Sequence, residues 1–152
     1  MASLFTTDRL FHLRLSGPPV AQPRHSVGIG RGGYPRAYIP DGHPVHDYKG
    51  FVRSMARRKW NWPPLEGPLE SQVLFVSETE GRGRWKDTKP DLDNYIKALW
   101  DALAGIVYVG DGQIAASREW KRFRFPWEKP FVEVLIRKID RDVTCPTQLF
   151  RD

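Results

Sequence analysis

Three carboxylates and one lysine stand close together in this chain of 152 residues. Asp91 and Asp93 lie within the stretch KPDLDN at positions 89–94, Lys97 follows, and Asp111 comes after a further apolar run. If the three carboxylates meet, their mutual repulsion requires a cation, and an all-oxygen ligand set suits Mg²⁺ or Mn²⁺. Such an ion can activate water and neutralise charge on a phosphoryl oxygen, which is the chemistry of phosphodiester hydrolysis.

A helix must position most of these side chains. Pro90 is placed to begin it, and it is expected to end near Gly105. Its apolar residues repeat at three and four positions on one arc: Leu92, Tyr95, Ile96, Leu99, Leu103 and Ile106. Asp91 and Asp93 then occupy the first turn, where the helix dipole favours negative charge, so ordinary helix stabilisation also explains both acids.

Lys97 and Asp111 have ordinary explanations as well. Lys97 can contact a scissile phosphate or orient water, or it can form an i, i+4 pair with Asp93 or Asp101. Asp111 stands in the turn Gly110-Asp111-Gly112. It returns to the helix N-terminus only if the apolar run 106–109 lies along a neighbouring element.

The remaining elements predict a single α+β domain over residues 1–152, with a mixed sheet of about four strands packed against two principal helices. Alternating apolar residues indicate a strand at Leu10–Ser16, and a long loop follows to about Gly42. We expect the other elements at these positions: a helix after Pro44, ended by Trp62-Pro63-Pro64; a buried strand at 73–76; a loop at 80–89; and strands at 113–121 and 132–138, forming an antiparallel pair.

Composition limits the class of protein. Lys and Arg number 24 against 18 Asp and Glu, a net charge of +6 that favours a polyanionic partner such as nucleic acid. Cys145 is the single cysteine, so neither an internal disulfide nor a cysteine-rich zinc site is expected. No run of about 20 apolar residues is present, and Asp8 and Arg9 interrupt the position of a secretory signal, so we expect a cytoplasmic protein without a membrane partner.

The order and spacing of these motifs resemble the RusA-type Holliday junction resolvases. The similarity lies in KPDLDN, the lysine three residues after Asn94, the segment beginning at Asp101, and Asp111-Gly-Gln. It extends more weakly to Gly17-Pro18-Pro19, Pro23-Arg24 and Tyr38-Ile39-Pro40. One position departs: family members commonly carry two adjacent acids before the Gln motif, whereas Gly110 stands first here. The tail 139–152 has no recognised counterpart.

The resemblance implies a homodimeric, Mg²⁺-dependent endonuclease that cuts four-way DNA junctions by paired nicks in recombination and repair. Asp91, Asp93 and Asp111 would bind the ion and Lys97 would be the catalytic lysine. A two-fold dimer matches a junction with two equivalent strands. Such a protein would act at the nucleoid and can be phage or prophage encoded. The residues expected to contact DNA phosphates are Arg24, Arg31, Arg53, Arg57, Arg82, Arg84 and Lys86.

Other patterns support competing interpretations. Residues 28–33 satisfy G-x-G-x-x-G, but no clear strand precedes them and Pro35 follows, so we expect a basic loop and no nucleotide cofactor. His43 and His46 define an alternative metal nuclease, although capping or loop roles suit them better. Segment 118–127 interleaves basic and aromatic residues, which fits a half-buried hairpin, a nucleic-acid surface or a dimer contact. A non-catalytic DNA-binding protein is the alternative from another functional class.

Overall fold

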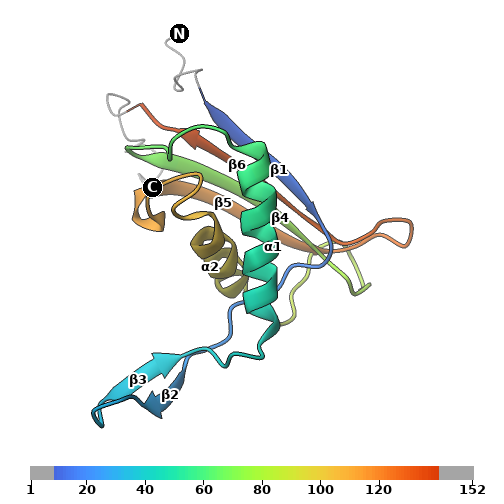
Figure 1. Ribbon diagram of the computed structural model, residues 1–152. Coiled ribbons are helices and arrows are strands. Elements are labelled where there is room, and N and C mark those ends of the chain that lie inside the picture. The colour runs from blue at the N-terminus through green and yellow to red at the C-terminus, as the bar shows by residue number, and fades with distance from the viewer. Residues whose placement is uncertain (1–8, 141–152) are drawn as a thin grey trace, which may run out of the picture.

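A twisted sheet of four strands forms the centre of the computed structural model, which describes residues 9–140 (Figure 1). The strands are β1 (Leu10–Ser16), β4 (Leu69–Ser77), β5 (Ile114–Phe123) and β6 (Phe131–Lys138), in the order β1-β6-β4-β5. β6 runs antiparallel to both of its neighbours, whereas β5 runs parallel to β4. The predicted mixed sheet of four strands is therefore confirmed.

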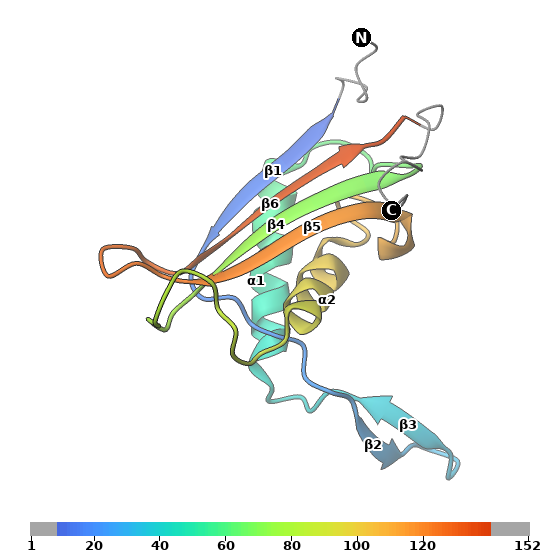
Figure 2. The same cartoon turned by 180° about the vertical axis from the view of Figure 1, so that it is seen from behind.

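Two helices cover one face of this sheet. α1 (Pro44–Lys59) and α2 (Leu92–Leu103) lie side by side on the same face, while no helix of residues 9–140 lies on the opposite face (Figures 1 and 2). α2 ends two residues before Gly105, whose positive φ of 81° turns the chain away from the helix. Ile106, expected on the helical arc, therefore lies beyond the helix. Otherwise both predicted helices are confirmed.

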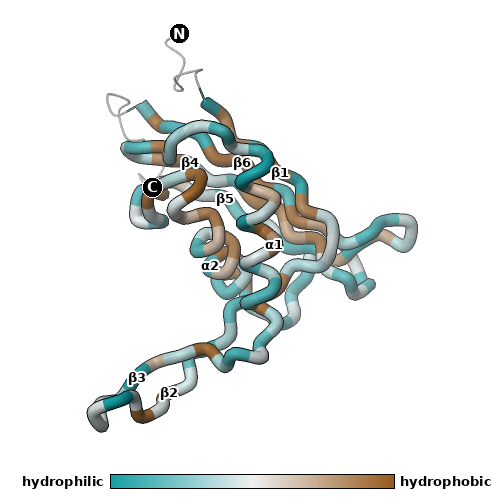
Figure 3. The backbone as a smooth tube through the Cα atoms, viewed as in Figure 1, coloured by the Kyte–Doolittle hydropathy of each residue, from teal (hydrophilic) through white to brown (hydrophobic). Residues whose placement is uncertain are grey.

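The core forms between the sheet and these helices. Phe11, Leu13 and Leu15 point inward from β1 and alternate with exposed residues, as the sequence pattern predicts. Val52 of α1 and Leu99 of α2 are fully buried in the same cluster. Figure 3 shows the apolar segments concentrated in the sheet and α2. One core thus joins both helices to the sheet.

The predicted pairing of the last two strands is wrong. β5 and β6 do not form a hairpin pair, because β4 lies between them and hydrogen-bonds to both. β4 carries buried residues on both of its faces near its end, including Phe75 and Val76. β4 is buried on both faces there because it lies inside the sheet, whereas the more polar β5 forms an edge strand.

The prediction of a structureless loop from 17 to 42 is also wrong. This segment contains a two-stranded antiparallel sheet of β2 (Ser26–Ile29) and β3 (Pro35–Tyr38), which extends away from the body (Figures 1 and 2). Gly32 and Gly33 take positive φ values at its turn. Every residue of β3 is exposed, and in β2 the exposed residues are the apolar Val27 and Ile29, so the hairpin has no buried apolar face by which the sequence could reveal it.

After β6 the chain passes next to the residue that precedes β4. The backbone N–H of Ile139 donates to the carbonyl of Pro68 at 2.9 Å. The rest of the tail assigned to 139–152 lies outside the described residues from position 141 onward. No helix of residues 9–140 is long and apolar enough to cross a membrane.

Replacing Leu99 by alanine should lower the free energy of unfolding by about 2–5 kcal/mol, because it leaves a cavity between α2 and the sheet. Urea denaturation followed by circular dichroism measures this loss. Leu10, which is 55% exposed, provides the matched control, since Leu10→Ala should cost about 0.5 kcal/mol or less. Equal losses in the two variants would contradict the assignment of Leu99 to the core.

Candidate active site

Asp91 stands at the N-cap of α2, one residue before the helix begins. Its carboxylate does not cap the helix backbone; instead Oδ2 accepts a hydrogen bond from Nζ of Lys89 at 2.6 Å. This hydrogen bond, assisted by the charges of Lys89, Lys121 and Arg24, holds the pKa of Asp91 below its ordinary value although partial desolvation opposes it. The carboxylate of Asp91 is therefore ionised throughout the neutral range.

Asp93 lies in the first turn of α2 and is exposed. Within the described part of the chain, no hydrogen bond or ion pair to its carboxylate is found. An acid without a partner at a helix N-terminus is stabilised by the backbone N–H groups alone and is available to a ligand.

Lys97 lies one turn further along α2 and contacts two carboxylates. Its Nζ is 3.0 Å from Oδ1 of Asp101 and 3.3 Å from Oδ2 of Asp111. The hydrogen bond from Lys97 to Asp101 raises the pKa of Lys97 although desolvation opposes it, and Asp111 adds to the increase. The side chain therefore carries a positive charge at any physiological pH. The i, i+4 pair with Asp101 is present, and Asp111 also returns to the helix.

The return of Asp111 depends on the chain that follows α2. Val107 and Tyr108 are fully buried, and the carbonyl of Val107 accepts a hydrogen bond from the N–H of Leu65 at 2.7 Å. This apolar run thus lies along the segment that precedes β4. It carries Asp111 to the second turn of α2, beside Lys97, rather than to the helix N-terminus.

Gln113 locks the turn that presents Asp111. Its side-chain oxygen accepts from the N–H groups of Val109 and Gly110 at 2.8 and 3.1 Å. Its side-chain nitrogen donates to the carbonyls of Leu65 and Gly67 at 2.9 and 3.0 Å. Sequence reasoning noted the Asp-Gly-Gln motif but gave the glutamine no role, because these four partners come from two separate segments.

α1 supports the same region from the other side. Nζ of Lys49 is 3.4 Å from Oδ2 of Asp101, so Asp101 lies between two lysines. Arg53 donates from Nε to the carbonyl of Ala102 at 3.1 Å and from Nη2 to the carbonyl of Asp101 at 3.4 Å. Arg53, expected to contact DNA, thus caps carbonyl groups at the C-terminal end of α2.

A pocket of about 650 Å³ opens at the N-terminal end of α2 and combines both signs of charge. Arg24, Lys89 and Asp91 line it, together with Asn94. Gln22 lines the same pocket, and its Oε1 is buried without a hydrogen-bond partner in the part of the chain that is described. A buried carbonyl oxygen without a partner, such as Oε1 of Gln22, requires a hydrogen-bond donor or a cation. The sequence analysis did not single out Gln22.

The predicted ligands are not gathered into one set. Among residues 9–140, no three His, Cys, Asp or Glu side chains lie close enough to hold one metal ion together. Asp91 and Asp93 mark the N-terminus of α2, and Asp111 lies against Lys97. The chemistry of the donors nevertheless fits Mg²⁺, since carboxylate and amide oxygens are its preferred protein ligands.

The residues expected to contact DNA have different surroundings. Arg31 and Arg57 are exposed, on the hairpin and on α1, and Arg82 and Arg84 are exposed in the loop before α2. Lys86 is only 8% exposed and donates to Oγ1 of Thr88 at 2.6 Å. Burial, followed by the charge of Lys121, lowers the pKa of Lys86. Lys86 therefore fastens its loop and is poorly placed to reach a phosphate.

Both histidines of the alternative metal site have local partners. Nδ1 of His43 accepts from the backbone N–H of Val45 at 3.1 Å and so caps α1. Nε2 of His46 lies 3.0 Å from the carbonyl oxygen of Pro40. The expectation of capping or loop roles is confirmed.

Comparison with known proteins agrees with this arrangement. The model of the family Endodeoxyribonuclease RusA matches residues 16–137, which include both helices, the hairpin and the turn with Asp111. The chain belongs to the RusA family. It is also similar to YqaN of Bacillus subtilis (strain 168), described as an uncharacterized protein, with 29% identity over 137 residues covering 81% of this chain and 92% of YqaN. Membership of the RusA family supports a nuclease that acts on DNA.

Replacing Gln113 by alanine should lower the free energy of unfolding by about 1–3 kcal/mol, because it removes four hydrogen bonds that join two segments. Chemical denaturation and amide hydrogen exchange at Val109 and Gly110 measure the effect. Gln72→Ala is the matched control, since the side chain of Gln72 makes one hydrogen bond of 3.4 Å to Glu70. Unchanged exchange at both amides would contradict the proposed lock.

The carboxyl group of Asp91 should titrate below its ordinary pKa of 3.8, and Lys89→Met should move that pKa upward. The loss of the hydrogen bond from Lys89 destabilises the ionised form, which gives the direction of the shift. Carbon-detected NMR of the side-chain carboxyl follows the titration. Lys129→Met, which removes an exposed lysine from the β5–β6 connection, serves as the control and should leave the pKa of Asp91 unchanged.

Proposed function

We propose that this member of the RusA family is a Mg²⁺-dependent endonuclease that resolves four-way DNA junctions by paired nicks. The observation that carries the proposal is the position of Asp111 against Lys97 on α2, the helix that begins with Asp91 and Asp93. The start of α2 supplies two acids, the turn that follows Gly110 supplies a third, and Lys97 supplies a positive charge beside it. The chain also belongs to a family of endodeoxyribonucleases.

Asp91, Asp93 and Asp111 are the proposed ligands of Mg²⁺, for which Mn²⁺ can substitute, and because the three acids do not form one ligand set among residues 9–140, the proposal requires their side chains to move together when the ion binds. Each is at least partly exposed. The partners of Asp91 and Asp111 are lysines whose side chains are 79% and 51% exposed, so both ion pairs can exchange for a metal ion. When bound, the ion supplies an activated water and neutralises charge on the phosphate.

The side chains of the chain itself have separate roles. The ammonium group of Lys97 stabilises negative charge that develops on the phosphate in the transition state. Its contacts with Asp101 and Asp111 restrict its position before the substrate binds. Arg24 lines the pocket next to Asp91 and is proposed to contact the adjacent DNA backbone.

A homodimer is part of this proposal. A four-way junction presents two equivalent strands, and a two-fold symmetric dimer presents two equivalent sites to them. The exposed arginines at positions 31, 57, 82 and 84 are proposed to contact further phosphates, which makes affinity dependent on salt. Light scattering coupled to gel filtration measures the oligomeric state, and a monomer on the junction would contradict this part of the proposal.

Cleavage of a labelled synthetic four-way junction tests the function directly. With Mg²⁺ we expect paired nicks in the junction, no cleavage of linear duplex of the same sequence, and no cleavage in EDTA. Asp91→Asn, Asp93→Asn and Asp111→Asn should each reduce the rate by about 10²–10³-fold, since each removes a charged group from the site.

The matched control is Asp47→Asn, because Asp47 is an exposed acid in the first turn of α1 and reproduces the helix-dipole effect without the site. This variant should cleave like the wild type. Full activity of the three site variants would contradict the assignment. Binding of the junction without cleavage in either Mg²⁺ or Mn²⁺ would instead support the non-catalytic DNA-binding alternative.

A further inference from the structure

An aromatic pocket lies on the face of the sheet opposite α1 and α2. It has a volume of about 480 Å³, within the range of about 300–1,000 Å³ that is usual for ligand sites. Two tryptophans line it and are unusually open to solvent: Trp85 is 58% exposed and Trp120 is 39% exposed. The complete lining is Leu74, Arg84, Trp85, Trp120, Arg122 and Phe125.

The backbone fixes both tryptophans in place. Trp120 belongs to β5 and lies opposite Leu74 of β4 in the register of the sheet. The loop that carries Trp85 runs along the free edge of β5, where Trp85 forms an isolated antiparallel bridge with Arg122. The N–H of Phe123 donates to the carbonyl of Arg84 at 3.1 Å. The pocket is therefore formed by two segments that hydrogen-bond to each other.

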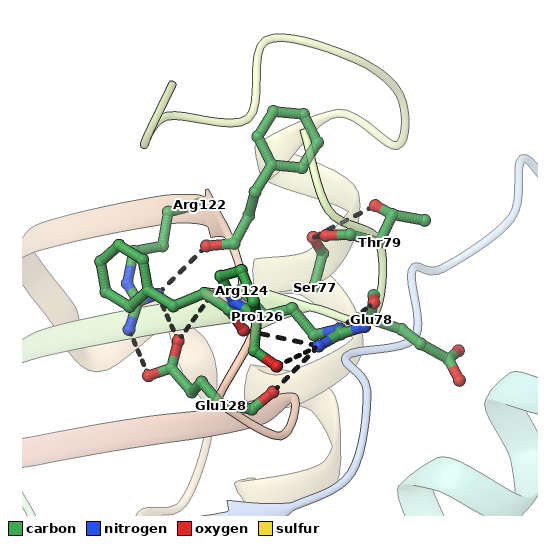
Figure 4. A network of polar contacts seen from close by, with 9 residues as sticks. Ser77, Glu78, Thr79, Arg122, Arg124, Pro126 and Glu128 are labelled. Carbon is green, nitrogen blue, oxygen red and sulfur yellow. Dashed lines mark hydrogen bonds and ion pairs between the residues drawn. The ribbon is translucent and has the colours of Figure 1, made fainter. Parts of the chain in front are cut away.

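One wall of the pocket is rigid and electrically balanced. Arg122 makes two hydrogen bonds of 2.7 Å to the carboxylate of Glu128, which also accepts from the N–H of Phe125 (Figure 4). The guanidinium of Arg122 lies 4.7 Å from the centre of the Phe125 ring. The pKa of Glu128 is lowered chiefly by the hydrogen bonds from Arg122. This pair orients the aromatic ring and leaves no net charge.

Two other arginines supply uncompensated positive charge. Arg84 lines the pocket, with its guanidinium 5.7 Å from the centre of the Phe125 ring. Arg118 is exposed on β5, two residues before Trp120 and hence on the same face. Neither has a carboxylate within ion-pair distance among the residues that the structure describes. A ligand that complements this surface has aromatic rings and negative charge.

The pocket is also joined to the candidate active site. Lys121, the next residue after Trp120, donates from Nζ to the carbonyls of Thr88 and Pro90, both at 2.8 Å. The loop that carries Trp85 is thereby tied to β5 up to the residue before Asp91. A DNA strand bound at the N-terminus of α2 would meet the tryptophans by following this loop round the edge of the sheet.

We propose that this pocket binds an unpaired nucleobase of branched DNA, with the base stacked on Trp85 or Trp120 and a neighbouring phosphate at Arg84. The inference rests on the proposed function and assigns it a second contact, specific for unpaired nucleotides. Nucleic-acid bases stack on aromatic side chains irrespective of sequence, while flanking cations hold the backbone. Segment 118–127, left open between a hairpin, a nucleic-acid surface and a dimer contact, is thus assigned to nucleic acid.

A single-stranded thymidine 12-mer is the probe, because it presents unpaired bases without any junction. Fluorescence anisotropy in EDTA measures its dissociation constant, with a linear duplex measured in parallel. Trp85→Ala and Trp120→Ala should each weaken binding of the 12-mer by about tenfold, with less than a twofold change for the duplex. Trp85→Phe should restore most of the affinity, since it keeps an aromatic face.

Trp62→Ala is the matched control, because Trp62 is also exposed, at 57%, and lies outside the pocket. Circular dichroism verifies that every variant is folded. Unchanged affinity of the two pocket variants for the 12-mer would overturn the proposal. A shift of either variant from dimer to monomer in gel filtration would also overturn it, because the pocket would then be a contact between two copies of the chain.

The same variants separate this inference from the proposed function. Junction cleavage by the wild type, combined with tryptophan variants that bind the 12-mer normally, would refute the pocket and leave the nuclease intact. Tryptophan-dependent binding of the 12-mer by a wild type that cuts no junction would refute the resolvase and support the base pocket.

Discussion

The side-chain amide of Gln113 connects the turn that carries Asp111 to the segment that precedes β4. It satisfies two N–H groups on its own turn and two carbonyls on the segment that leads into β4. Asp111 lies in a 3₁₀ segment of three residues between the buried run that contains Val107 and Tyr108 and the start of β5, and Gln113 ties this segment to the chain before β4. The approach of Asp111 to Lys97 depends on this amide. A neutral group performs this role well, because a charged one would disturb the electrostatics of the neighbouring acids.

Charges alternate through the site from α1 to the turn. Lys49, Asp101, Lys97 and Asp111 follow one another, each within 3.4 Å of the next. All four side chains are at least partly exposed, so each pair contributes little to stability on its own. The alternation instead fixes a position, because it holds the ammonium group of Lys97 between Asp101 and Asp111.

The helices and the acidic motif were predictable because their signals are local. The 3.6-residue period of α2 and the alternation in β1 report burial on one face, and both patterns survive in the folded chain. The β2–β3 hairpin buries no apolar face, since Val27, Ile29 and all of β3 are exposed, and its sequence therefore carries no sign of packing against the core. Parallel pairing of β5 with β4 and the contacts of Gln22 and Gln113 join residues far apart in the chain, for which a single sequence contains no signal.

The β2–β3 hairpin has its two roots in the wall of the pocket at Asp91. Pro23 and Arg24 enter it from one side, and His43 and Pro44 leave it on the other, all four lining that pocket. The N–H of Gln22 is tied to the carbonyl of Asn94 on α2 at 2.9 Å. The hairpin is therefore anchored to the body next to Asp91, at the N-terminal end of α2. A partner that binds the outer end of the hairpin would therefore act on residues that also line the pocket in which Asp91 stands.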